Sequence, residues 1–275
     1  MSNILDTACQ FYWKFNAKRI LAERPKEYRG DNTKFTRFIL LAHQRTGSSM
    51  VMATLNKHPS IVAFGELFVK SRIGHMVSGF NNHSKALHYL RSKDPVRFLE
   101  EHAYSSFPEN ISSVGFKIFP DQLERKDAAP LLPWLNENKD VKIIILTRNN
   151  LLDVHCSLAI ANKTGVFGIR KESDRQMVTI NVDIHKAEAE FKRRKAGHQR
   201  AREKFVDHEV IELAYEDIIE QPTEEFKKIQ SFIGVTLTQL HVPTVKQETR
   251  PLSEVIENYD ELKIKWKGAE YEEYL

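Results

Sequence analysis

The chain has 275 residues, 41% of them hydrophobic and 28% charged, with a formal net charge of +4 at pH 7. This length and apolar content predict one large core and a single domain over residues 1–275, and the mild charge suits a small anionic ligand without indicating a nucleic-acid partner. Two cysteines without a framework spacing, no signal-peptide pattern and no apolar run of transmembrane length indicate a cytoplasmic protein.

Strand-like apolar blocks recur along the chain after an N-terminal helix expected at about residues 4–22. They lie at 37–43, 61–64, 114–118, 141–146 and 210–213, with helical patterns between them. The block VKIIIL at 141–146 is typical of a strand buried on both faces. This alternation predicts an α/β fold with a central parallel sheet flanked by helices. Ligands of such sheets bind outside the carboxyl ends of the strands, here after His43, Phe64 and Thr147.

Two polar segments, at about 71–110 and 163–182, are long enough to be insertions that face a substrate, although ordinary surface excursions would look the same. Residues 183–204 predict a charged helix whose second half is strongly basic. Such a face is more often solvated than a binding site for a polyanion. From Leu252 onward, the acid-rich stretch predicts a tail that packs over the domain.

The first strand block runs through a polar turn into a helical pattern, FILLAHQRTGSSMVMATL at residues 38–55. A turn between a strand and a helix aims backbone N–H groups and the positive helix end at one point, where anions bind. Gly47 allows close approach, Ser48 and Ser49 add hydroxyl donors, and Arg45 supplies a fork suited to phosphate or sulfate. A plain N-capped helix with a surface arginine is the alternative interpretation of this stretch.

A second anion-binding group is predicted in IIILTRNNLLDVHCSLAIA at residues 143–161. Arg148 falls where a buried strand ends, and Ser157 follows nine residues later on a helix that begins near Asn150. Alone, Arg148 would more often form a salt bridge than bind a ligand. Beside the first loop, however, it indicates a nucleotide with phosphates at both ends.

Together these elements resemble the sulfotransferases that use 3′-phosphoadenosine 5′-phosphosulfate (PAPS), in particular the bacterial carbohydrate type, similar to the Nod-factor and trehalose enzymes. QRTGSS at 44–49 matches the 5′-phosphosulfate loop of that family, GEL at 65–67 matches a motif after its second strand, and Arg148 with Ser157 matches its 3′-phosphate site. LAYEDIIEQPTEEFKKIQSFIGV at 213–235 resembles its Tyr-Glu-Asp segment. The resemblance covers most of residues 37–268 and implies a P-loop-like three-layer fold.

The resemblance also implies in-line transfer of a sulfuryl group from PAPS to a hydroxyl of a carbohydrate or glycolipid, with no metal ion. Arg45 would neutralise the leaving phosphate, while Arg148 and Ser157 would hold the 3′-phosphate. The 5′-phosphosulfate would be bound by Thr46, Gly47, Ser48 and Ser49. Lys246 and Arg250 match a basic late loop that folds over the 3′-phosphate in related enzymes, although this chain lacks the glycine-rich form of that loop.

The acceptor hydroxyl must lose a proton, and the GE motif points to Glu66 as the base. We expect Glu66 at a strand-to-helix turn, where partial burial would suit it to that role; a simple helix N-terminal residue is the alternative. His75, expected one or two turns into that helix, is the second candidate base, and His43 is expected in the strand. Lys117 ends a strand, where a site role and a structural role are equally open.

Two other classes of protein remain open on the sequence alone. A nucleotide kinase or triphosphatase would need a Lys-Ser/Thr pair after the glycine and a magnesium-binding acid, and neither is visible. A non-catalytic protein that binds adenosine 3′,5′-bisphosphate or a sulfated ligand would keep Arg45 and Arg148 yet lack a working base. Oligomeric state cannot be inferred from these patterns.

Overall fold

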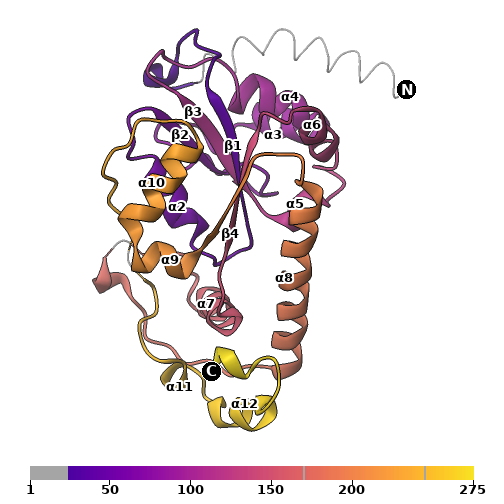
Figure 1. Ribbon diagram of the computed structural model, residues 1–275, viewed down its shortest axis with the longest axis vertical. Coiled ribbons are helices and arrows are strands. Elements are labelled where there is room, and N and C mark those ends of the chain that lie inside the picture. The colour runs from indigo at the N-terminus through magenta and orange to yellow at the C-terminus, as the bar shows by residue number, and fades with distance from the viewer. Residues whose placement is uncertain (1–23, 170, 245) are drawn as a thin grey trace.

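The computed structural model describes residues 24–169, 171–244 and 246–275, so the helix expected at about 4–22 lies outside the described residues. Five parallel strands form a central sheet in the order β2-β3-β1-β4-β5 (Figure 1). The strands are β1 (Thr36–Ala42), β2 (Ile61–Glu66), β3 (Ser113–Ile118), β4 (Lys142–Thr147) and β5 (Val210–Ala214). The predicted parallel sheet flanked by helices is confirmed.

Alternation along the central strand explains why both faces of the sheet are covered. In β1, Phe38 and Leu40 pack into one core while Ile39 and Leu41 pack into the other. Successive side chains of a strand point to opposite faces, so a strand that is apolar throughout must bury both. The two cores therefore define three layers, with the sheet in the middle.

Helices cover each face of the sheet and close these cores (Figure 1). One face is covered by α2 (Ser48–Leu55), α9 (Tyr215–Glu220) and α10 (Pro222–Phe232). The other carries α3 (Lys85–Lys93), α4 (Pro95–Phe98), the π-helical turn η2 (Leu99–Ala103), α5 (Pro120–Leu123), α6 (Leu131–Glu137) and the end of α8 (Ile184–Lys204).

A third core lies beyond the strand ends, in the lower part of Figure 1. It joins α7 (Leu151–Thr164) and the start of α8 to α11 (Leu252–Val255), α12 (Tyr259–Trp266) and the short helix η4 (Glu272–Tyr274). Phe191 lies at its centre, with ring centroids 5.9 Å from Trp266, 5.5 Å from Tyr271 and 5.4 Å from Tyr274. The acid-rich tail is thus a packed part of the fold. Two further short helices are η1 (Lys26–Tyr28) and η3 (Glu172–Asp174).

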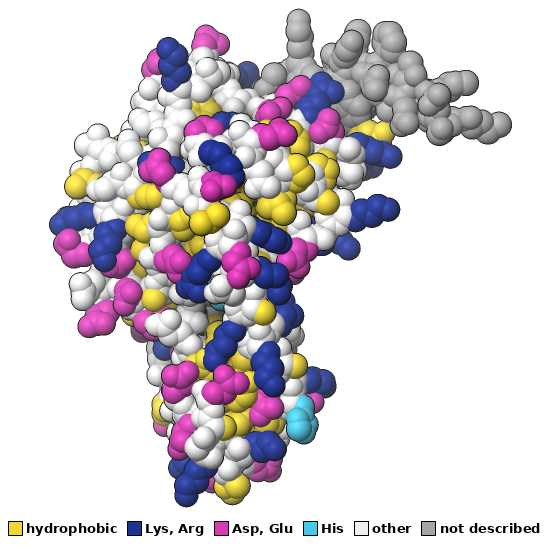
Figure 2. Space-filling model, turned by 45° about the vertical axis from the view of Figure 1, so that its right-hand side comes forward, with side chains coloured by type: hydrophobic (Ala, Val, Ile, Leu, Met, Phe, Trp, Pro, Cys, Tyr) yellow, Lys and Arg dark blue, Asp and Glu magenta, His cyan; other side chains and the backbone are white. Residues whose placement is uncertain are grey.

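The outer face of α8 is a mixed surface. Lysine and arginine side chains alternate with acidic ones over this side of the molecule (Figure 2). Arg200 pairs with Glu124 at 3.2 Å, and Arg202 pairs with Glu212 at 2.5 Å. The basic half of the predicted helix is therefore largely neutralised by neighbouring carboxylates. Within the described residues, no helix is long and apolar enough to cross a membrane.

The segment after β2 differs from the sequence expectation. Residues 67–84 form turns and irregular structure instead of a helix, and Glu66 is the last residue of β2. The chain folds back on the strand end, because Gly65 N–H donates to the carbonyl of His75 at 2.9 Å and Gly74 N–H donates to that of Glu66 at 3.0 Å. The expected strand-to-helix turn is wrong, and Glu66 is no helix N-terminal residue.

Candidate active site

A cavity of about 1190 Å³ opens at the carboxyl ends of the strands. It is lined by residues that follow β1, end β2 and β3, and follow β4 and β5, as the topology rule predicts. Of the residues singled out by sequence, it contains Arg45, Gly47, Ser48, Ser49, Glu66, Lys117, Arg148, Ser157, Lys246 and Arg250. Thr46 is buried beneath the loop, where its hydroxyl donates to the carbonyl of His43 at 2.8 Å.

The loop between β1 and α2 has the conformation of an anion cradle. Gly47 has φ +83° and α2 has no side-chain cap, so the first N–H groups of the helix have no such partner. A Cβ on Gly47 would lie 2.5 Å from the ring of Tyr215, so both conformation and close packing require glycine. The interpretation of this stretch as a plain N-capped helix is therefore not supported.

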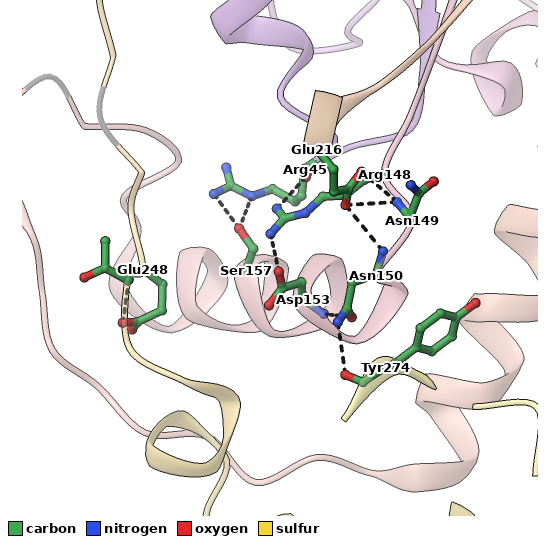
Figure 3. A network of polar contacts seen from close by, with 10 residues as sticks. Arg45, Arg148, Asn149, Asn150, Asp153, Ser157, Glu216, Glu248 and Tyr274 are labelled. Atoms are coloured by element: carbon green, nitrogen blue, oxygen red, sulfur yellow. Dashed lines mark hydrogen bonds and ion pairs between the residues drawn. The ribbon is translucent and has the colours of Figure 1, made fainter. Parts of the chain in front are cut away.

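The side chain of Arg45 reaches across the cavity to α7. Its Nε and Nη2 donate to Ser157 Oγ at 2.9 and 2.8 Å (Figure 3). Nη1 donates to the carbonyl of Phe167 at 2.5 Å, and Nη2 also reaches Gln247 Oε1 at 2.6 Å. Arg45 and Ser157, expected at opposite ends of the donor, thus touch directly, and these partners of Arg45 are all neutral.

Arg148 lies at the end of β4, directly beside the loop. Nη2 pairs with Asp153 at 2.8 Å, and Nη1 donates to the carbonyl of Arg45 at 3.3 Å (Figure 3). The guanidinium also stacks on Tyr215, with 4.6 Å to the ring centroid. Nε is buried without a hydrogen-bond partner. This N–H group lies near Arg45, whose described partners are neutral, and the two features together suit an anionic ligand group.

The electrostatics of this corner point the same way. Burial lowers the pKa of Arg45, and the nearby charge of Arg148 lowers it further. Two cations are therefore held close together, and only Arg148 is paired with a carboxylate, that of Asp153. A bound anion would relieve this repulsion.

A second group joins Glu66 to the loop. Lys117 at the end of β3 is 2% exposed, and its Nζ contacts Glu66 Oε1 at 2.8 Å and Ser49 Oγ at 2.7 Å. Burial lowers the pKa of Lys117, although the carboxylate of Glu66 opposes the shift. Glu66 keeps one side open to the cavity, with its side chain 26% exposed. Lys117 therefore belongs to the site, a role that the sequence left open.

The histidine alternatives are buried away from the cavity. His75 is fully buried; its Nδ1 lies 2.8 Å from Asn82 Oδ1 and its Nε2 lies 2.7 Å from Nε2 of His102. Burial lowers the pKa of His75 to about 4, which ill suits a base at neutral pH. His43 follows β1 and packs edge-on against His198, 4.8 Å between ring centroids. Neither lines the cavity.

The late loop is tied to its neighbours. Arg250 pairs with Glu248 at 2.6 Å and donates to the carbonyl of Val178 at 2.7 Å. Arg175 holds the carbonyl of Lys246 at 3.1 Å. Lys246 and Arg250 thus line the cavity wall, but the guanidinium of Arg250 already has a carboxylate partner.

Sequence reasoning missed several residues that shape the site. The ring of Tyr215 packs against both Gly47 and Arg148. The carboxylate of Glu216 accepts from Asn149 N–H at 3.1 Å (Figure 3). Gln247 Oε1 accepts from Arg45 Nη2 at 2.6 Å. The Tyr-Glu-Asp stretch after a strand was the available signal for the first two.

These groups can bind a ligand with two anionic ends and offer a carboxylate to a hydroxyl between them. Within residues 24–169, 171–244 and 246–275, no group of three or more His, Cys, Asp or Glu residues could hold a metal ion. The fold and the cavity are those of a group-transfer enzyme that binds an anionic nucleotide. A family model described as "Sulfotransferase domain" matches residues 35–262, so the chain belongs to the sulfotransferase family.

Enzymes of this family use PAPS as donor, so the resemblance, the enzyme class and the donor predicted from the sequence are confirmed. Nodulation protein H of Rhizobium tropici is 27% identical over 245 residues, covering 86% of this chain and 92% of the relative. Nodulation protein H of Rhizobium meliloti (strain 1021) is 25% identical over 243 residues, covering 85% and 92%.

Solved sulfotransferases are similar at lower identity. One from Alicyclobacillus acidocaldarius is 16% identical with a TM-score of 0.48, covering 84% of this chain and 91% of that one. A mouse sulfotransferase complexed with PAP is 11% identical with a TM-score of 0.40, covering 81% and 64%.

Proposed function

We propose that this enzyme transfers the sulfuryl group of PAPS to a hydroxyl of a carbohydrate or glycolipid, with Glu66 as the base. The observation that carries the proposal is the placement of Glu66, Lys117 and Ser49 in one hydrogen-bonded line. This line lies beside the loop between β1 and α2, which we call the donor loop. Two curated relatives are nodulation proteins, and the sulfotransferases that the sequence resembles through its GE motif act on such acceptors. Two cysteines without a framework support a cytoplasmic setting.

The donor would lie between the loop and α7. Backbone N–H groups at the start of α2, with the hydroxyls of Ser48 and Ser49, would hold its 5′-phosphosulfate. Arg148 would bind the 3′-phosphate through its guanidinium, and Ser157 would add a hydroxyl, since both side chains line the cavity. Arg45 would exchange its neutral partners for the anionic donor, because an anionic acceptor adds Coulomb attraction to the hydrogen bond.

The chemistry needs an aligned hydroxyl and a proton acceptor near the sulfuryl group, which the bound donor supplies. Glu66 would accept the proton through the carboxylate oxygen that Lys117 does not occupy. Lys117 keeps a positive charge near Ser49, where negative charge develops during transfer. Burial of Lys117 shields this charge from water and so strengthens its effect on the site.

The acceptor would enter over the segment after β2. Arg72, Met76 and Ser78 of that segment line the cavity, together with Tyr28 and Lys57. This mixture of polar groups and apolar surface suits a sugar ring that carries an apolar substituent. A non-catalytic binding protein is disfavoured because a carboxylate stands beside the donor loop.

The test is calorimetric titration with adenosine 3′,5′-bisphosphate, AMP and ATP, followed by a transfer assay with PAPS and a panel of sugars and glycolipids. We expect the bisphosphate to bind more tightly than AMP or ATP, and at least one carbohydrate acceptor to be sulfated. Equal or tighter binding of ATP would refute the donor assignment. Donor binding without transfer to any hydroxyl compound would favour the sensor.

A further inference from the structure

Side-chain donors bind three successive carbonyl oxygens of the donor loop. The pairs are Thr46 Oγ1 with the carbonyl of His43 at 2.8 Å, Arg194 Nη1 with that of Gln44 at 3.0 Å, and Arg148 Nη1 with that of Arg45 at 3.3 Å. In a planar trans peptide the C=O points opposite to the next N–H. Fixing these carbonyls therefore fixes the N–H groups of residues 44–46, which point away from the three side chains that hold the carbonyls.

Arg194 reaches the loop from the middle of α8. Its side chain is 2% exposed, so no bulk water replaces a missing partner. Nε and Nη2 donate to Glu190 Oε1 at 2.7 and 2.6 Å, and the other oxygen of Glu190 lies 2.8 Å from His155 Nδ1 on α7. A buried charge held in this way leaves Nη1 directed at the carbonyl of Gln44. We name Glu190 and Arg194 the loop anchor.

The loop anchor lies where α8 touches the root of the loop. A Cβ on Gly197, one turn after Arg194, would lie 2.6 Å from Nε2 of His43, so glycine allows the close approach of the helix. His198 packs on His43 from the same helix. The packing of Gly197 and His198 on His43 brings α8 close enough for the side chain of Arg194 to reach the backbone of the loop.

The residue that follows the anchored carbonyl is held in an unfavourable conformation. Arg45 has φ +67°, one of two described non-glycine residues with positive φ. Such a conformation persists only where surrounding contacts determine it. The anchor at the preceding carbonyl and Arg148 at its own carbonyl are the contacts that do so.

We propose that the loop anchor is a positioning device for the donor: by holding the carbonyl of Gln44, it keeps the N–H of Arg45 turned toward the 5′-phosphosulfate. Neither residue lines the cavity, so both act through the loop and do not touch the donor. The inference rests on the proposed function and concerns only the 5′ end of the nucleotide. The 3′-phosphate would be bound by Arg148 and Ser157, which are not part of the loop anchor.

The experiment compares two ligands that differ at the 5′ end. Wild type and Arg194→Met are titrated with adenosine 3′,5′-bisphosphate and with adenosine 3′-monophosphate, which lacks the 5′-phosphate. We expect Arg194→Met to weaken bisphosphate binding by about tenfold or more, because a buried carbonyl and a carboxylate lose their donor. Binding of the monophosphate should change by less than about twofold, since its contacts do not involve the anchored peptide.

Three further variants make the result specific. Arg194→Lys keeps the charge but not the fork, so it should retain most of the bisphosphate defect; full recovery would show that charge alone matters and would overturn the proposal. Glu190→Gln should weaken binding of the bisphosphate but not of the 3′-monophosphate, and this variant provides the test if Arg194→Met does not fold. Arg200→Met, an exposed arginine of the same helix that pairs with Glu124, should behave as wild type.

Equal weakening of both ligands would mean a general loosening of the fold, and unchanged bisphosphate binding would mean no positioning role; either overturns the inference. Failure of the wild type to prefer the bisphosphate over AMP and ATP would instead refute the proposed function. The two failures are thus read from different measurements.

Discussion

Replacing Arg148 with methionine tests the 3′-phosphate site most directly. The change removes the guanidinium but keeps an unbranched stem near Tyr215, which lies 4.6 Å from the guanidinium carbon in the wild type. One N–H of Arg148, on Nε, has no hydrogen-bond partner, and the side chain lines the cavity. Losing a charge-assisted contact costs about 1.5–3 kcal/mol, which corresponds to roughly tenfold to hundredfold in Kd.

A second effect adds to the first. Asp153 pairs with Arg148 at 2.8 Å, and the substitution leaves its carboxylate facing the site without a cation. Its side chain is 31% exposed, so water screens much of the repulsion and we expect a minor contribution. The double variant Arg148→Met/Asp153→Asn should therefore bind the bisphosphate slightly better than Arg148→Met alone.

The assay is calorimetric titration with adenosine 3′,5′-bisphosphate and with 5′-AMP. Wild type should prefer the bisphosphate, and Arg148→Met should lose that preference; its affinity for AMP should fall by a smaller factor, because Arg148 also holds the carbonyl of Arg45 in the 5′-phosphate loop. Arg202→Met, an exposed arginine that pairs with Glu212, is the matched control. If Arg148→Met kept the wild-type preference, the 3′-phosphate would bind elsewhere and the assignment of Arg148 would be refuted.

Three more outcomes follow from the same contacts. Glu66→Gln should lower turnover by roughly 10²–10⁴-fold while bisphosphate affinity hardly changes; unchanged single-turnover rates with PAPS would remove Glu66 as the base. Gly47→Ala adds a methyl group 2.5 Å from the ring of Tyr215 at φ +83°, so calorimetry should show a loss of about 1–3 kcal/mol of stability, with bisphosphate binding weakened; an unchanged melting temperature would contradict the packing argument. Burial lowers the pKa of His75 to about 4, so as the pH falls its imidazole takes up a proton in the unfolded protein before it does so in the folded protein. The contribution of His75 to the free energy of unfolding is therefore complete above pH 6.5 and falls toward pH 4 by up to about 1.4 kcal/mol per pH unit. Urea unfolding at pH 7.5 and 5.5 should show a slope of this sign, and His75→Gln should reduce it. Part of the slope should remain, because burial also lowers the pKa of His43, His102 and His198. A variant with the full wild-type slope would contradict a contribution from His75.

The local parts of the site could be predicted because local physics determines them. Runs of β-branched residues identified the buried strands, and the rule on carboxyl ends brought Arg45 and Arg148 to one edge of the sheet. Ser157 falls on the facing side of α7 because its helix starts at the N-cap residue Asn150, as the sequence indicated. Each of these steps needs only a short stretch of chain.

The remaining parts depend on how distant elements dock. The contact of Arg194 with the carbonyl of Gln44 spans 150 positions along the chain, and that of Arg45 with Gln247 spans 202. Neither has a local signal, since a basic residue on a charged helix is usually solvated. The segment after β2 was expected to begin as a helix, whereas backbone hydrogen bonds of Gly65 and Gly74 return it to the strand end.

The distribution of charge at this edge of the sheet explains why a donor with two anionic ends fits it. Arg148 and Lys117 each have a carboxylate partner, Asp153 and Glu66, whereas the described partners of Arg45 are a hydroxyl, a carbonyl and an amide. Breaking an ion pair would be costly, but exchanging neutral partners for a phosphate is favourable. Arg45 is therefore the cation with most to gain from a bound anion, and it sits on the loop whose backbone conformation Arg148 and the loop anchor hold in place. Under the proposed assignment, donor recognition would combine one exchangeable cation with a fixed set of N–H groups.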